Sequence, residues 1–464
     1  MNIAKRLKFF LCLGISLWLT TSFISHSNQS VTPDYDLVIY GATFSGIAAA
    51  INAAEYGHAV ALVEEYNQIG GLMTSGLSNT DFISFESLSG TFLDYCKRVE
   101  KYYIDKYGAN SQQVEDCHAG IHAEPHVTLK IFQEMLAEHS NFPAYLNHRL
   151  ERVSLGKPYL QLRHIERIKC FSLTDSASVE LVGQIFLDAT YEGDLAAFAG
   201  VEYRVGRESR QEYGEPLAGH IFYQNRRILN GSTGEGDHRV QGYNFRVIMT
   251  DDPNNRRLID QPDNYQREDY LPIAEVLEQE KVSQVFARFG RDAILRAQMI
   301  PYRKEEVYDI KNAPVRIALL GENYAYPEGS PEVRAKIVKH HQEHILGLLY
   351  FLQNDTAVPE KYRQEARQWG LAKDEFVDNE NFPPRIYIRE ARRVMGEYVF
   401  TQNDVSPQQG TLIVPYKKDA IAIGDYALNC HGVQPPSLYS SVAEGDYNFI
   451  PPPFQIPFGV IVPR

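Results

Sequence analysis

Three residues near the start of the chain could together bind a phosphate-containing ligand. Gly41 and Gly46 flank a short turn, and Glu64 ends the next apolar run, about 20 residues further on. Residues without side chains let the backbone approach a pyrophosphate, whose charge the free N–H groups at a helix N-terminus can hold. A carboxylate such as that of Glu64 accepts hydrogen bonds from ribose hydroxyls and repels a 2′-phosphate. The chemistry expected here is dinucleotide binding.

The elements that must position these residues are visible in the same stretch. Asp36–Tyr40 is a short apolar run typical of a buried parallel strand, and Ile47–Tyr56 carries alanines at helical spacing. Gly57 ends that helix, and Ala59–Val63 supplies a second strand. Thr43 replaces the usual middle glycine, so an ordinary βαβ unit without a nucleotide is the alternative. The order strand, turn, helix, strand and acid predicts a Rossmann-like dinucleotide-binding fold.

Two later segments distinguish between the dinucleotides. Gly70 and Gly71 follow soon after the ribose acid and would let the chain fold back over a bulky cofactor, which a nicotinamide dehydrogenase does not need. Residues 185–194 read IFLDATYEGD, a short strand that ends in Asp188, where a carboxylate could meet a ribityl–phosphate region. Together these segments favour FAD.

These segments and several others resemble one protein family in their order along the chain. The pieces are YGATFSGIAAAINAA at 40–54, IGGLMTSGL at 69–77, AEPHVTLKIFQEML at 123–136, FLDATYEGDLAAFAGVEYRVGRE at 186–208, WGLAKDEF at 369–376, YIREARRVMGEYVFTQ at 387–402 and QIPFGVIVP at 455–463. They are similar to bacterial FAD-dependent oxidoreductases of the glutathione-reductase-like superfamily, in the branch labelled xanthan-lyase-like or heterodisulfide-reductase-A-like. The resemblance implies an FAD fold with an inserted substrate domain and does not imply a known substrate.

The motifs and the resemblance together predict which residues contact the cofactor. Four groups are expected, for the pyrophosphate, the adenosine ribose, the flavin and the ribityl side. In that order they are Gly41, Thr43, Phe44, Ser45 and Gly46; Glu64; Gly70, Gly71, Met73 and Thr74; and Asp188, Thr190 and Glu192.

The expected fold class is α/β. A Rossmann-like FAD-binding domain, with a parallel sheet and helices on both faces, would carry an inserted, largely helical α+β substrate domain. The first part of the FAD domain is expected at 31–207, with a helical insert at about 91–140. The substrate domain is expected at 208–385, and 386–464 would return towards the FAD domain.

The catalytic residues are predicted from the last part of the chain. His431 is the candidate acid/base group, because proton removal often accompanies hydride transfer to a flavin. Arg389 and Arg392, at i and i+3 on an expected helix, could clamp a carboxylate or a sugar acid, and an internal ion-pair network with Glu390 and Glu397 explains them equally well. The expected reaction moves hydride from a small polar substrate to FAD, which an unidentified acceptor reoxidises. Carbohydrate-like and carboxylated substrates both stay open.

Two alternatives to a working flavoenzyme are carried forward. His340, Glu343 and His344 match the H-x-x-E-H pattern of zinc hydrolases, but so short a pattern arises easily by chance, and no metal is assigned. Relatives in the resembled family run on past the segment 455–463 into a strand and a Gly-rich helix. The second alternative is therefore a truncated or split flavoprotein that binds FAD weakly or not at all and does not turn over.

Charge and cysteine usage exclude two further classes of function. The formal net charge of −13 over 464 residues argues against nucleic acid, which needs a basic surface. The five cysteines, Cys12, Cys96, Cys117, Cys170 and Cys430, include no Cys-x-x-Cys pair, so an iron–sulfur cluster is not expected. One or two disulfides stay open.

The N-terminus predicts export. Lys5, Arg6 and Lys8 precede an apolar run at Phe9–Leu19, which is shorter than the roughly 20 residues of a spanning helix. A cleaved signal at 1–30 and a periplasmic or extracellular protein without a stable membrane span are expected. Anchoring by an uncleaved signal is the alternative.

Overall fold

The computed structural model of the chain describes residues 32–139, 142–157, 163–290, 292–311, 313–408, 410–436 and 442–464. Contacts divide the chain after Pro33, and the description below concerns Asp34–Arg464. The predicted signal at 1–30, with Cys12, lies outside the described residues. Among the helices of the described ranges, none combines the length and the apolar character that crossing a membrane requires.

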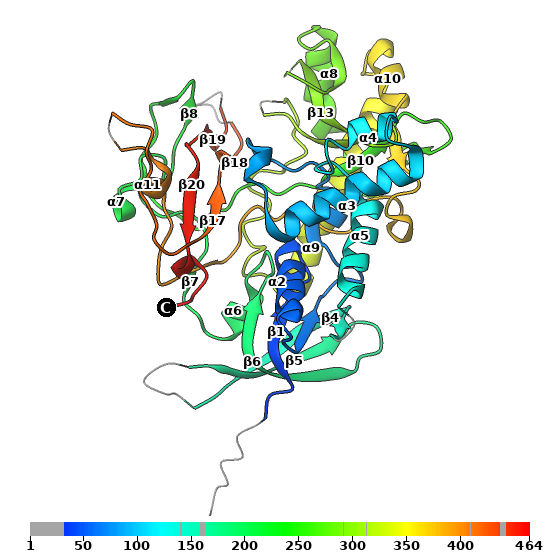
Figure 1. Cartoon of the computed structure of the whole chain (residues 1–464). Helices are drawn as coiled ribbons and strands as arrows, with labels where there is room; N and C mark the ends of the chain where they lie inside the picture. Colours follow the sequence, from blue (N-terminus) through cyan, green and yellow to red (C-terminus); the bar gives the residue numbers. More distant parts are fainter. Residues whose placement is uncertain are drawn as a thin grey trace, which may run out of the picture. The chain divides into compact units, whose positions relative to one another are not determined.

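The predicted strand–turn–helix–strand unit forms the centre of a six-stranded sheet (Figure 1). Its order is β3-β2-β1-β6-β5-β4, and β3, β2, β1 and β6 run parallel while β5 and β4 are antiparallel. The strands are β1 (Tyr35–Tyr40), β2 (Val60–Val63), β3 (Ala144–Tyr145), β4 (His148–Leu155), β5 (Ile165–Ser172) and β6 (Ser178–Asp188). Since β2 is buried at all four residues, its continuous apolar sequence reflects burial on both faces, as predicted.

Helices cover one face of this sheet and the curled β4–β6 hairpins cover much of the other. The covering helices are α2 (Phe44–Glu55), α3 (Gly90–Tyr107) and α5 (Pro125–Ala137), with the short α4 (Gln112–Asp116) between the last two. Ile39 and Leu62 pack under them, whereas Val38 and Val63 pack on Ile168 and on the short helix α6 (Asp194–Phe198). The predicted Rossmann-like fold is confirmed, and on its second face the short α6 is accompanied mainly by strands.

The middle of the chain folds around a second six-stranded sheet. Its order is β11-β15-β10-β14-β13-β12, and only the β12–β13 pair is parallel. The strands are β10 (Val247–Thr250), β11 (Arg256–Arg257), β12 (Gln284–Ala287), β13 (Ala293–Ile300), β14 (Lys304–Asp309) and β15 (Gly370–Ala372), and the main helices are α8 (Leu271–Glu278), α9 (Pro331–Asn354) and α10 (Glu360–Arg367). Helix α9 begins at Pro331, where the Ser330 hydroxyl caps it by accepting from the Val333 N–H. The region is α+β, with more sheet than the sequence analysis expects.

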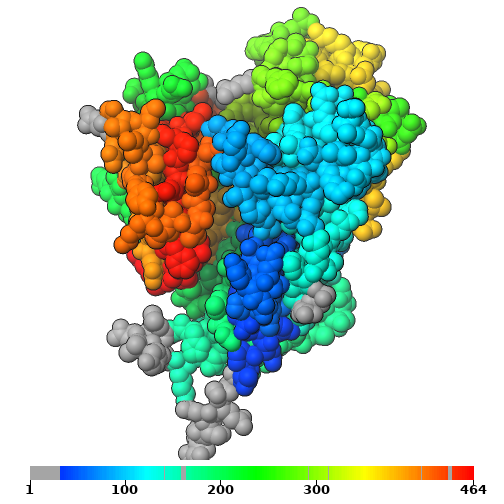
Figure 2. All heavy atoms as spheres, viewed as in Figure 1, coloured from blue at the N-terminus to red at the C-terminus, as the bar shows by residue number. Residues whose placement is uncertain are grey.

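The C-terminal part consists of short paired strands. β17 (Ala420–Gly424) pairs with β20 (Phe454–Pro457), and β18 (Leu428–Gln434) pairs with β19 (Glu444–Phe449). The remaining short elements are β7 (Tyr203–Arg204), β8 (Tyr223–Gln224), β9 (Arg227–Ile228), β16 (Arg393–Val394), α7 (Arg210–Tyr213) and α11 (Gln402–Val405). In Figure 2 these orange and red strands lie beside the blue and cyan N-terminal part. Asp425 joins the two by accepting hydrogen bonds from the backbone N–H groups of Ile83 and Ser84.

Candidate functional site

The glycine turn between β1 and α2 is packed so tightly that only hydrogen fits at its two glycines. A Cβ added at Gly46 would lie 2.1 Å from the Gly41 carbonyl oxygen, and one at Gly41 would lie 2.7 Å from the backbone of Ala189. Gly41 also has a φ of +104°, which side-chain-bearing residues rarely adopt. The turn therefore brings the N-terminus of α2 directly over the ends of β1 and β6.

The start of α2 is left open for an anion. Thr43 occupies the cap position, but its hydroxyl donates to the Ala189 carbonyl at 2.7 Å and does not cap the helix. The first turn contains no acidic residue, and Ser45 is exposed beside it. Free N–H groups and the positive end of the helix dipole favour a negatively charged ligand at such a position.

The double-glycine loop folds back onto the glycine turn, and its predicted passage over a cofactor stays a prediction. The Gly70 N–H donates to the Ala42 carbonyl at 2.7 Å, and Gly70 and Gly71 have φ values of +98° and +59°. Residues Gly71–Thr74 form a 3₁₀ turn, in which Met73 is partly buried and the Thr74 hydroxyl donates to the Ile69 carbonyl. The loop therefore passes beside the glycine turn.

Glu64 lies at the end of β2 and is 2 % exposed. Its carboxylate accepts from the Ala42 N–H at 2.8 Å and from the Tyr66 N–H at 3.0 Å, and it forms a 2.6 Å ion pair with Arg385. Arg385 also stacks on the Tyr66 ring, with its guanidinium 3.8 Å from the ring centre. The acid is in the predicted place, and its contact with a ribose stays a prediction.

The acids after β6 differ in what they contact. The Asp188 carboxylate accepts from the Thr190 N–H and hydroxyl and from the Ala196 N–H, so it organises the turn that follows its strand. Glu192 is buried and accepts from the Tyr326 hydroxyl at 3.2 Å. Burial raises the pKa of Glu192 to about 7. Their roles on the ribityl side stay predictions.

A cavity of about 1040 Å³ opens at the carboxyl ends of the parallel strands. Tyr40, Tyr66 and Asn147, which end or follow β1, β2 and β3, line it together with Glu192. A smaller cavity beside it reaches Gly41 and shares several of these residues. Ligands of open α/β sheets bind in this position, outside the carboxyl ends at the point where strand order reverses. The glycine turn, the open helix start and the cavity together fit a dinucleotide.

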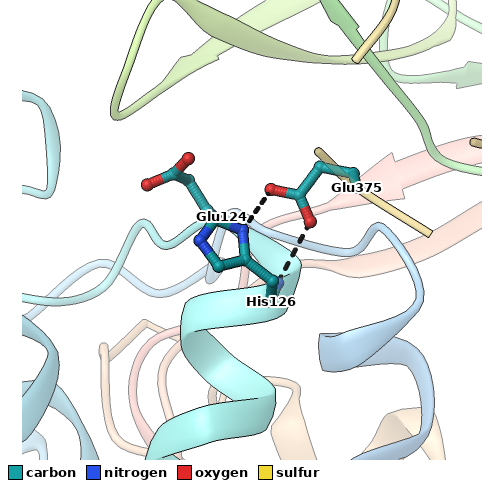
Figure 3. A group of neighbouring side chains, drawn as sticks. All are labelled: Glu124, His126 and Glu375. Atoms are coloured by element: carbon teal, nitrogen blue, oxygen red, sulfur yellow. Dashed lines mark hydrogen bonds and ion pairs between the residues drawn. The ribbon is translucent and has the colours of Figure 1, made fainter. Parts of the chain in front are cut away.

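A buried charge network that the sequence analysis missed forms one wall of the cavity. Figure 3 shows Glu124 and His126 at the start of α5 with Glu375 beside them. His126 Nδ1 lies 2.7 Å from a Glu375 oxygen, and these three side chains could in principle hold a metal ion. The Lys304 ammonium already contacts Glu124 at 2.6 Å, Glu375 at 2.7 Å and Asp374 at 2.8 Å. The lysine therefore supplies the positive charge itself. His126 is visible in the sequence, but Glu375 lies 249 residues away.

The predicted arginine clamp is not formed, because the YIREARR segment is not a helix. Residues 386–392 contain no helical turn, so i and i+3 are not placed on one helix face. Arg392 pairs with Asp194 at 2.5 Å and Glu328 at 2.6 Å, as in the ion-pair alternative, although with other partners. Arg389 forms no ion pair with any described residue, and it stacks on the Tyr387 ring at 4.5 Å.

His431 lies on β18 close to Arg389. Burial, and then the positive charges of Arg389, Lys311, Arg246 and Arg316, hold the pKa of His431 well below its usual range. The imidazole is therefore neutral at physiological pH, and the same positive charges make it a weak base. Its catalytic role stays a prediction.

The H-x-x-E-H residues do not assemble a metal site in the part of the chain that the structure describes. The ring nitrogen Nε2 of His344 lies 2.7 Å from the Arg316 carbonyl oxygen, and Glu343 accepts from Asn264. His340 is exposed on α9. The described cysteines, Cys96, Cys117, Cys170 and Cys430, are all free and buried.

A family model described as FAD dependent oxidoreductase matches residues 36–464. No curated protein matches the chain. THI4 of Thermovibrio ammonificans aligns at 14 % identity over 45 % of this chain and 75 % of that one, with a TM-score of 0.26.

Two further solved structures align over shorter shares of their own length. A glycerol-3-phosphate dehydrogenase from Bacillus halodurans, complexed with FAD, aligns at 11 % identity over 41 % of this chain and 43 % of that one, with a TM-score of 0.24. The bacillithiol disulfide reductase Bdr from Bacillus cereus aligns at 15 % identity over 34 % and 39 %, with a TM-score of 0.23. Scores this low carry no argument, so the assignment rests on the family model.

Proposed function

The chain belongs to the FAD-dependent oxidoreductase family, and on that premise we propose that it takes hydride from a C–H bond of a small polar substrate. Bound FAD supplies the hydride acceptor, and the residues of this chain bind, orient and exchange protons. The observation that carries the proposal is the glycine turn, in which Gly41 and Gly46 leave an open helix start over the sheet ends. We also propose that the chain belongs to the xanthan-lyase-like or heterodisulfide-reductase-A-like branch of the family. A separate, unidentified electron acceptor would reoxidise the flavin.

In this proposal the cofactor is held by groups already in place. The backbone N–H groups of Phe44, Ser45 and Gly46 bind the pyrophosphate, because the Thr43 side chain leaves them uncapped. Glu64 faces the adenosine ribose, supported by Arg385. The loop at Gly70–Thr74 lies beside the flavin, and the turn after Asp188 closes the ribityl side.

His431 is proposed to accept the substrate proton. Its ring nitrogens have no hydrogen-bond partner among the described residues, so one of them is free to meet a substrate hydroxyl or amine. The surrounding positive charges make the neutral imidazole the resting form. An anionic substrate would raise the pKa of His431 and strengthen it as a base.

The deciding experiment is the absorbance of the purified chain. A yellow protein with one FAD per chain, bleached anaerobically by a member of a panel of polyols, sugar acids and hydroxy acids, supports the proposal. A colourless protein that takes up no added FAD would overturn it and favour the alternative of a fragment without turnover. Chelation separates the zinc alternative, which requires stoichiometric zinc and no flavin.

We also propose export to the periplasm or beyond, on the basis of the basic and apolar segments at 1–30. N-terminal sequencing of the protein recovered from its native host tests this. A mature N-terminus near residue 30 supports cleavage, and an intact Met1 in the membrane fraction would favour the anchored alternative.

A further inference from the structure

Arg389 differs from the other interior arginines in its surroundings. Arg207, Arg246, Arg316, Arg334, Arg385 and Arg392 each pair with a carboxylate. Arg389 has no acidic group within 4 Å among the described residues, and its Nε donates only to the Gly242 carbonyl at 3.1 Å. Desolvation, together with the repulsion of Arg246 and Arg316, lowers the pKa of Arg389 to about 10, whereas pairing raises the others.

Among the described residues, the basic side chains around His431 outnumber by one the buried acids that face them. Four basic side chains converge there: Arg246, Lys311, Arg316 and Arg389. Three acids oppose them: Glu306 pairs with Arg246 at 2.6 Å, Asp309 with Arg316, and Asp446 with both Lys311 and Arg316. Asp81, a fourth acid, also acts on Arg246, but it is solvent-exposed and forms no ion pair with a described residue. A single bound anion would neutralise the surplus guanidinium.

Polar atoms around Arg389 also lack partners. Arg246 is 8 % exposed and Asn244 fully buried, and the Arg246 Nε and both polar side-chain atoms of Asn244 make no hydrogen bond with any described residue. Asn244 forms an antiparallel bridge with Tyr387. Arg246 and Arg389 both lie over the Tyr387 ring, at 5.2 and 4.5 Å from its centre. Buried donors without partners are rare in proteins and indicate a missing ligand or water.

This cluster adjoins the predicted flavin loop. Glu306 accepts hydrogen bonds from the backbone N–H groups of Ser78 and Asn79, at 2.9 and 3.0 Å, while it pairs with Arg246. A Cβ at Gly76 would lie 2.0 Å from the Arg246 carbonyl oxygen. The segment that follows Gly71–Thr74 therefore packs directly on the backbone at Arg246, just before β10. Arg389 and His431 are partly, and not fully, buried.

We propose that Arg389 and Arg246 bind the carboxylate of a small monoanionic substrate, with His431 beside its reacting carbon. The inference rests on the proposed function and deepens it by choosing a carboxylated substrate over a neutral carbohydrate. Arg389 offers the guanidinium fork that carboxylates match, and stacking on Tyr387 holds its plane. Glu306 cannot serve as the anion that pairs with Arg389, because its carboxylate already binds Arg246 and the backbone at Ser78–Asn79.

The test compares matched ligands on the FAD-loaded chain by calorimetry and by flavin difference absorbance. Each pair shares a skeleton and differs in charge: acetate and acetamide, lactate and lactamide, and glucuronate and glucose. We expect saturable binding of at least one carboxylate without its neutral partner. Arg389→Gln should weaken that binding about 10- to 100-fold, as expected for a lost charge-assisted pair. Arg389→Lys should recover part of it.

Arg98→Gln is the matched control, because Arg98 on α3 pairs with Asp94 and Glu138, away from this cluster. The proposal is overturned if no carboxylate in the panel binds, if neutral partners bind equally, or if both glutamine variants behave alike. Preferential binding of inorganic phosphate would overturn the carboxylate class. If Arg389→Gln does not fold, the wild-type ligand pairs still decide. Failure of the proposed function appears separately as loss of FAD, since calorimetry reads carboxylate binding on colourless protein too.

Discussion

Replacing Lys304 by methionine should destabilise the fold severely. The Lys304 side chain is fully buried, and its ammonium contacts Glu124, Asp374 and Glu375 at 2.6–2.8 Å. Glu124 and Glu375 are themselves 2 % and 1 % exposed, so the variant would leave two buried carboxylates without their cation. Removing one partner of a buried ion pair costs about 3–5 kcal/mol, out of a total stability of about 5–15 kcal/mol.

The assay is urea unfolding followed by the fluorescence of Trp369, which packs against Phe286 with ring centres 5.8 Å apart. We expect the midpoint of Lys304→Met to fall by about 1–2 M. The matched control is Lys130→Met on α5, since Lys130 is exposed and pairs only with Glu134 one turn away. Its midpoint should match that of the wild type.

The pH dependence of the Lys304→Met defect gives a second check. Burial raises the pKa of Glu124 and Lys304 lowers it, so the variant should raise the Glu124 pKa further. A carboxyl with a raised native pKa binds more protons when folded, and the stability of the variant therefore increases as pH falls. We expect the defect to shrink from pH 8 to pH 5.5, and Glu124→Gln added to Lys304→Met to recover part of it. Equal midpoints for the two lysine variants, or a defect that grows in acid, would refute the reasoning.

Three other expectations concern the cofactor cradle, a titrating acid and metal. Gly46→Ala should lose FAD, because its Cβ would meet the Gly41 carbonyl oxygen at 2.1 Å, whereas a Cβ at Gly57 would have no atom within 4 Å and Gly57→Ala should purify yellow. Equal flavin contents in the two variants would contradict the assignment of the glycine turn to cofactor binding. Because the buried Glu192 is more stable in its neutral form, the wild type should lose about 3 kcal/mol of folding stability as pH rises from 4.5 to about 7. Urea midpoints at pH 5 and pH 8 measure this loss, and Glu192→Gln should remove it. Chelation by EDTA should leave flavin content and turnover unchanged, since Lys304 fills the place of a cation, and stoichiometric metal by elemental analysis would refute this.

The cofactor side of the molecule could be predicted from sequence because neighbouring residues build it. The turn at Gly41–Gly46, the helix after it and the strand ending in Glu64 form one continuous segment, so spacing alone predicts their geometry. Strand β6 could be predicted for a similar reason, since a local apolar run in the sequence ends in the acid Asp188. The helix expected around Arg389 was wrong, because the buried Ile386 and Ile388 alternate with the half-buried Tyr387, a period of two and not of a helix. The charges that follow, at Arg389 and Arg392, only mimic helical spacing.

The substrate side could not be predicted in this way, because it is defined by which charges cancel across the fold. The sequence presents Arg389 and Arg392 as equivalent, and it shows neither Asp194, which neutralises Arg392, nor the absence of any such partner for Arg389 within the described ranges. Pairing every other nearby cation with its carboxylate leaves one guanidinium unmatched beside His431. Such a binding site is found only after every charge has been matched with partners that are distant in the sequence, so only the three-dimensional structure can reveal it.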